Sequence, residues 1–151
     1  MLFSFPERVN EVAARLVAAG VATSLTIALL FGQHWILPVL ALGFLLRVGF
    51  GPRFSPLARA AMSIAPRLAA PRPVAGAPKR FAQGIGALCA ITASALFFTG
   101  HLTAGRSVTA LVLVFATLEA SIAFCAGCFM YRLLQRAGIL SPDACLDCVV
   151  D

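Results

Sequence analysis

The amino-acid sequence predicts an all-α, polytopic membrane protein whose chain crosses the bilayer four times. Of its 151 residues, 60% are hydrophobic and only 12% are charged, whereas a soluble domain has about 25% charged residues. So little charge cannot cover a water-facing surface, and so much apolar character excludes a disordered chain. The sequence also contains four apolar stretches of about 20 residues, the length with which a helix crosses a bilayer core of about 30 Å. These stretches are residues 12–31, 35–54, 81–99 and 107–127.

The first apolar stretch follows acidic and basic residues, Glu7, Arg8 and Glu11, and three more stretches follow it. We therefore expect it to be retained as a helix and not to be removed as a signal peptide. The chain is too short for two ordinary domains. We expect one four-helix membrane domain over residues 1–135 and a cytoplasmic tail over residues 136–151.

The positions of lysine and arginine predict the orientation of the four helices. Ten of these residues flank the helices on one side, Arg106 lies on the other side, and Arg47 lies inside the second stretch. Basic residues stay on the cytoplasmic side of a membrane. We therefore expect a bacterial inner-membrane protein with both termini in the cytoplasm and two hairpins joined by a basic cytoplasmic loop. Topology alone explains the net charge of +6, so we expect no nucleic-acid partner.

The connection over residues 51–80 contains basic residues and no acidic residue. Pro56 suits the first turn of a short helix, and its apolar residues then fall on one face, as in an amphipathic helix of the headgroup region that is interrupted at Pro66. We expect the lipid bilayer to be the partner of this loop, and the alternative is a docking surface for a cytoplasmic protein or a small anion. The expected apolar face is Leu57, Ala61, Ile64 and Leu68, and the candidate binding residues are Arg53, Arg59, Lys79 and Arg80.

Four of the five cysteines form two Cys-x-x-Cys pairs, Cys125 with Cys128 and Cys145 with Cys148. This motif is the usual dithiol of thiol–disulfide exchange. Cys125 and Cys128 are expected on one face at the cytoplasmic end of the fourth helix, which makes them the candidate catalytic pair. Two alternatives remain. The first is a zinc site of all four cysteines, whose spacing is found in such sites, although a membrane helix does not easily form a zinc knuckle. The second is that Cys125 and Cys128 only pack a helix interface, as we expect for Cys89.

A carboxylate in the apolar part of the chain is the second chemical signal. Glu119 lies within the fourth stretch, and a charged group in hydrocarbon costs several kcal/mol unless it is paired, protonated or hydrated. Arg47 lies at an equal depth in the second stretch, so we expect the two residues to form an intramembrane polar pair. This position is compatible with two roles. The pair could be an ion pair that only fixes helix packing, or it could handle a proton or ligand.

Four further segments form a recognisable pattern: residues 6–11, 49–59, 78–86 and 125–128, the last followed by Tyr131. Together they resemble a bacterial membrane family catalogued as domain of unknown function 4395. The resemblance covers roughly residues 3–135, leaves the tail with Cys145 and Cys148 outside, and implies a four-helix membrane protein without assigning a reaction.

These signals favour a membrane-embedded thiol-redox or sulfur-handling component that acts with a cytoplasmic thioredoxin- or rhodanese-like partner. The alternative, from another class, is a non-enzymatic scaffold or a small transporter subunit whose basic loop recruits lipid or protein. Enzymatic activity is left open, no cofactor is identified, and an oligomer is compatible with the sequence.

Overall fold

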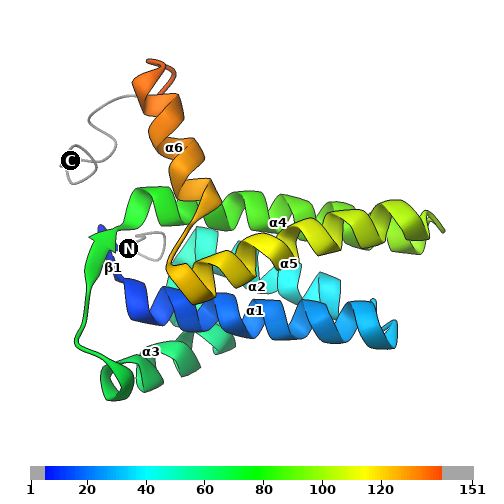
Figure 1. Cartoon of the computed structure of the whole chain (residues 1–151), viewed down its shortest axis with the longest axis horizontal. Coiled ribbons are helices and arrows are strands. Elements are labelled where there is room, and N and C mark those ends of the chain that lie inside the picture. Colours follow the sequence, from blue (N-terminus) through cyan, green and yellow to red (C-terminus); the bar gives the residue numbers. More distant parts are fainter. Residues whose placement is uncertain (1–5, 141–151) are drawn as a thin grey trace.

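The computed structural model describes residues 6–140, which are mostly helical. Four helices, α1, α2, α4 and α5, lie side by side along the long axis of the molecule (Figure 1). At one end of this bundle lie a two-stranded ribbon, the short helix α3, and the helix α6, which projects away from the bundle. The elements are β1 (Arg8–Asn10), α1 (Glu11–Phe31), α2 (Ile36–Phe50), the 3-10 helix η1 (Pro52–Phe54), α3 (Pro56–Leu68), β2 (Pro73–Ala75), α4 (Gly76–Phe98), α5 (Leu102–Ile122) and α6 (Ala126–Arg136).

Three of these helices, α1, α4 and α5, are long and apolar enough to cross a membrane. The second predicted span contains only the 15-residue helix α2, which is about 22 Å long and therefore shorter than a bilayer core. Large apolar side chains are exposed around the bundle, an arrangement that is rare in soluble monomers and suits a lipid surface. They include Leu30, Val39, Leu88, Phe98 and Val114.

Small residues form the contact between α2 and α4. Ala87, Ala90 and Ala93 of α4 are buried in the core. A Cβ atom added at Gly86 would lie 2.7 Å from the ring of Phe44 on α2. Without a hydrophobic force between helices in lipid, close approach through small residues is what stabilises the pair.

The two-stranded ribbon joins the beginning of α1 to the beginning of α4. Strand β1 pairs antiparallel with β2, with Val9 opposite Val74. Asn10 ends β1 and also caps α1, because its Oδ1 accepts a hydrogen bond from the backbone N–H of Val12 at 3.0 Å. The backbone N–H of Gly76 donates to the carbonyl of Glu7 at 2.7 Å. No strand is expected from the sequence, since three residues are too few to show alternation.

The helix α3 corrects one expectation for the basic connection. It continues through Pro66 to Leu68, so the loss of one backbone hydrogen bond at this proline does not end the helix. The face buried against the bundle consists of Ala58, Ala61 and Ala65. Of the predicted apolar face, Ile64 and Leu68 are exposed, as side chains that contact lipid would be, whereas Leu57 is half-buried and Ala61 is buried. Small residues face α1 because they allow the two helices to approach closely.

The helix α4 begins at Gly76, five residues before the predicted start at residue 81. Pro78 does not prevent this, because backbone N–H groups in the first turn of a helix have no intrahelical partner. Lys79 and Arg80 therefore belong to the first turns of α4 and not to a loop. This shift decides which residue meets Glu119.

The contact at Gly76 makes a specific stability prediction. An added Cβ would overlap the carbonyl oxygen of Pro6 and lie 3.0 Å from that of Glu7. We expect Gly76→Ala to displace β1 and to lower the free energy of unfolding by about 1–3 kcal/mol. Gly84→Ala is the matched control on α4, since nothing lies within 4 Å of its added Cβ, and it should gain about 0.5–1 kcal/mol. Thermal unfolding in mild detergent measures the stability of both variants. Equal changes in stability for Gly76→Ala and Gly84→Ala would contradict the role of Gly76.

Candidate functional site

The two candidate cysteines lie at the beginning of α6 and not on the membrane helix before it. The helix α5 ends at Ile122, and Ala123 takes a left-handed conformation with φ of 59°. Cys125 is then the N-cap residue of α6, and Cys128 is in its first turn. The predicted continuation of the fourth helix to residue 127 is therefore wrong. The apolar sequence hides the break, because an alanine occupies the position at which glycine usually ends a helix.

The thiols of Cys125 and Cys128 face each other across the first turn of α6. The Cys128 backbone N–H donates to Cys125 Sγ at 3.3 Å, and the Cys128 thiol donates to the same sulfur at 2.6 Å. Both cysteines are free and half-buried. A disulfide needs the sulfurs at about 2.05 Å, so small side-chain rotations bring this pair to bonding distance.

The surroundings make the two thiols unequal. The hydrogen bond from the Cys128 thiol, and also the charge of Lys79, lower the pKa of Cys125. The same hydrogen bond, together with burial, raises the pKa of Cys128. A helix N-terminus also stabilises a thiolate, because its free N–H groups carry partial positive charge. Cys125 is therefore the thiol of this pair that loses its proton more readily, and Cys128 is its hydrogen-bond donor.

Contacts with α4 hold the beginning of α6 in place. A Cβ added at Gly127 would lie 2.5 Å from Cβ and 2.6 Å from Cα of Ala82. Only glycine permits this approach without movement of a backbone. One turn further on, the buried Tyr131 packs edge-to-face on Phe81 with 5.5 Å between ring centroids.

Glu119 pairs with Lys79, and not with Arg47 as the sequence suggested. Lys79 Nζ lies 2.5 Å from Glu119 Oε1, and both side chains are largely buried. Because α4 begins before Lys79, this residue is fixed on the helix that packs against α5. The pair lies next to the dithiol, since the charges of both residues act on Cys125.

Arg47 makes its hydrogen bonds to neutral partners, and the charge of Glu119 acts on it without a direct ion pair. Its Nε donates to Gln83 Oε1 at 2.7 Å, and its Nη1 donates to Ser55 Oγ at 2.9 Å. The guanidinium also lies over the ring of Phe44, with its Cζ 4.6 Å from the ring centroid. Ser55, which precedes α3, thus uses its hydroxyl for Arg47 and makes no side-chain cap for that helix.

Arg15 is a residue whose role the sequence did not reveal. Its Nε donates to the carbonyl of Ala120 at 3.1 Å, and its Nη2 donates to that of Ser121 at 2.8 Å. A cation at this position satisfies carbonyl groups in the last turn of α5 and complements its dipole. The signal in the sequence was a basic residue early in the first span, at the depth where the fourth span ends.

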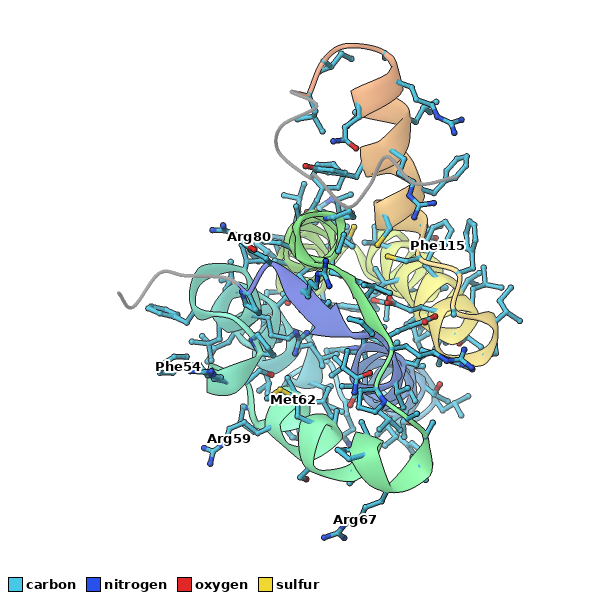
Figure 2. The ribbon with its side chains drawn as sticks, turned by 90° about the vertical axis from the view of Figure 1, so that its left-hand side faces the viewer. Phe54, Arg59, Met62, Arg67, Arg80 and Phe115 are labelled. Carbon is cyan, nitrogen blue, oxygen red and sulfur yellow. The ribbon has the colours of Figure 1, made fainter. Side chains whose placement is uncertain are left out.

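The other predicted residues do not form one cluster. Arg53, Arg59 and Arg80 are exposed on η1, α3 and α4, and Arg59 and Arg80 extend in different directions (Figure 2). Cys145 and Cys148 lie outside the described residues, and so does any zinc site that needs them. Between residues 6 and 140, no group of three or more His, Cys, Asp or Glu side chains is arranged to hold a metal ion.

Comparison with known proteins gives one positive result. The model of a family described as Domain of unknown function (DUF4395) matches residues 9–136, which include every element from α1 to α6. Searches of curated proteins and of solved structures give no match.

The ion pair between α4 and α5 predicts coupling between its two partners. We expect Lys79→Met and Glu119→Gln each to lower the free energy of unfolding by about 3–5 kcal/mol, because each leaves a buried charge without its partner. The double variant should lose clearly less than the sum. Unfolding in detergent measures the cycle. In the control cycle of Arg47→Met with Glu119→Gln, the losses should be closer to additive, and a stronger coupling there would contradict the assignment of Lys79.

The unequal thiols predict the pH dependence of alkylation. Because the thiolate is the reactive form and the pKa of Cys125 is lowered, its reaction with iodoacetamide should reach half its maximal rate at a lower pH than the reaction of an ordinary free cysteine does. Cys128 should react more slowly at every pH. Quantifying each modified peptide by mass spectrometry gives the two profiles.

Two variants of Cys128 separate the hydrogen bond from other causes. Cys128→Ala removes the side-chain donor, so the profile of Cys125 should move to higher pH. Cys128→Ser retains a hydroxyl donor and should move it less. If the profile of Cys125 in both variants is the same as in the unaltered chain, the side-chain hydrogen bond does not lower the pKa of Cys125.

Proposed function

The chain belongs to the family described as Domain of unknown function (DUF4395), which assigns no activity, and we propose that it is a membrane thiol–disulfide exchange component. The dithiol is Cys125 with Cys128. One observation supports this above all others: Cys125 caps α6, and its sulfur accepts hydrogen bonds from both the N–H and the thiol of Cys128. A packing role requires neither this position nor these bonds.

The exchange step follows from the unequal pKa values. The Cys125 thiolate attacks one sulfur of a partner disulfide, forms a mixed disulfide and releases the other sulfur as a thiolate. Cys128 then loses its proton and attacks Cys125 Sγ, which closes the Cys125–Cys128 disulfide and releases the second partner thiolate. Two electrons pass from the dithiol to the partner disulfide, and the reverse sequence returns them.

The partner in this proposal is a cytoplasmic thioredoxin-like protein. In this proposal the long helices α1, α4 and α5 and the shorter α2 cross the bacterial inner membrane as two hairpins, with both termini in the cytoplasm, because the basic residues flank the ribbon end of the bundle. The dithiol then lies at the cytoplasmic boundary. The helix α6 exposes Phe129, Met130 and Leu133 as it leaves the bundle, as a helix lying in the headgroup region would do.

A cavity beside Cys125 gives the attacked disulfide room. Its volume is about 280 Å³, and Cys125, Glu119 and Met130 line it together with apolar residues of α1, α4 and α5. An apolar wall excludes water from the sulfurs during exchange. It also suits an apolar side chain next to the cysteine of the partner.

Redox titration tests the proposed function. The full chain in nanodiscs is equilibrated with glutathione and glutathione disulfide at a series of ratios, and the cysteines are trapped by alkylation and identified by mass spectrometry. We expect a reversible internal disulfide of Cys125 and Cys128. Cys128→Ser should instead accumulate glutathione on Cys125, because the resolving thiol is absent. Inverted membrane vesicles should expose Cys125 to an impermeant maleimide, and intact cells should not.

Cys89→Ser is the matched control for a cysteine in the same cavity, since the half-buried Cys89 lines that cavity from α4 but makes no bond to the pair. It should leave the titration unchanged. If Cys125 and Cys128 stay reduced at every ratio, or react no faster than Cys89, the exchange function is wrong. The remaining reading is then the scaffold or transporter subunit, which would also retain its activity when both cysteines are replaced by serine.

A further inference from the structure

A second cavity, of about 320 Å³, lies at the ribbon end of the bundle among α1, α2, α3 and α4. This volume is at the lower end of the range of small-ligand sites. Arg8, Arg47, Arg53 and Lys79 line it, and none of its lining residues within 6–140 is acidic. Lys79 forms a direct ion pair with Glu119. Arg47 and Arg53 have no ion-pair contact in the described part of the chain, and the charge of Glu119 acts on Arg47 only from a distance.

Arg47 is the buried cation of this cavity. It is only 4% exposed, and its two bonded nitrogens have the neutral partners Gln83 and Ser55. Its third nitrogen, Nη2, is buried and has no hydrogen-bond partner in the described part of the chain. A buried guanidinium N–H group normally has an acceptor, so an anion in the adjoining cavity would complete the coordination of Arg47.

Apolar side chains form part of the cavity lining. Val17 of α1 and Ala58 and Met62 of α3 contribute to it. Met62 points toward the bundle, whereas Arg59 and Arg67 on the same helix extend away from it (Figure 2). The cavity lining therefore combines cationic and apolar side chains, which suits an anionic group attached to an apolar body as well as a small free anion.

We propose that this cavity binds a phosphate group, with Arg47 as its buried anchor and Arg53 at its mouth. The planar guanidinium presents paired N–H donors that match phosphate oxygens. The source is either the headgroup of an anionic phospholipid or free phosphate. This site goes beyond the exchange function, because the cavity that contains Cys125 is a different one.

Binding is tested with the full chain in nanodiscs of phosphatidylcholine, titrated calorimetrically with inorganic phosphate against chloride at equal ionic strength. In parallel, thermal unfolding is compared between these nanodiscs and nanodiscs of equal parts phosphatidylcholine and phosphatidylglycerol. Arg47→Met should abolish binding. Because that variant removes a buried group and can impair folding, the exposed Arg53→Gln is the second variant, and it should weaken binding about tenfold. Arg59→Gln, exposed on α3 and not part of the cavity wall, is the control and should change binding less than about twofold.

Saturable phosphate binding that depends on Arg53 supports a site for free phosphate. A rise of the unfolding temperature with phosphatidylglycerol that Arg53→Gln removes, without binding of inorganic phosphate, supports a lipid headgroup site. The proposal is overturned if neither ligand has an effect. It is equally overturned if Arg59→Gln weakens the effect as much as Arg53→Gln does, because general surface charge then explains it.

Discussion

The ion pair between Lys79 and Glu119 fixes the place where the membrane helices and the dithiol meet. It ties the first turns of α4 to the last turn of α5, and Cys125 follows within a few residues. Arg15 of α1 binds the carbonyl groups of the same last turn. Two helices, α1 and α4, therefore contact the last turn of α5, just before the chain turns into α6.

The close approach of α6 to α4 completes this junction. Gly127 lies against Ala82, and Lys79 is one turn before Ala82 on the same helix. The charge that lowers the pKa of Cys125 and the surface that holds α6 thus come from one short part of α4. Helix ends bring together the cation of Lys79, the carboxylate of Glu119 and the two thiols. The unpaired backbone groups of these helix ends also need hydrogen-bond partners.

The bundle is built with small residues inside and large apolar residues outside. Alanine and glycine allow α2 to lie against α4, while residues such as Leu88 and Phe98 remain exposed. In water this arrangement would be unfavourable, because the large apolar side chains would be exposed to solvent. In lipid it is stable, because the outer side chains contact acyl chains and the inner contacts depend on close packing.

The helical class, the membrane character and the closeness of Cys125 to Cys128 can be predicted from the sequence alone, because hydropathy, length and spacing are local properties. It did not determine which charge meets Glu119. Arg47 and Lys79 are both basic residues near a predicted membrane helix. Which of them pairs with Glu119 depends on where α4 begins and how it packs on α5. Nor did it show that Cys125 caps a helix. The break at Ala123 lacks the usual glycine, and contacts of Arg15 and Lys79 before it and of Ala82 after it hold the chain on both sides. Such contacts join residues far apart in the chain, so they depend on how the helices pack and not on the local sequence.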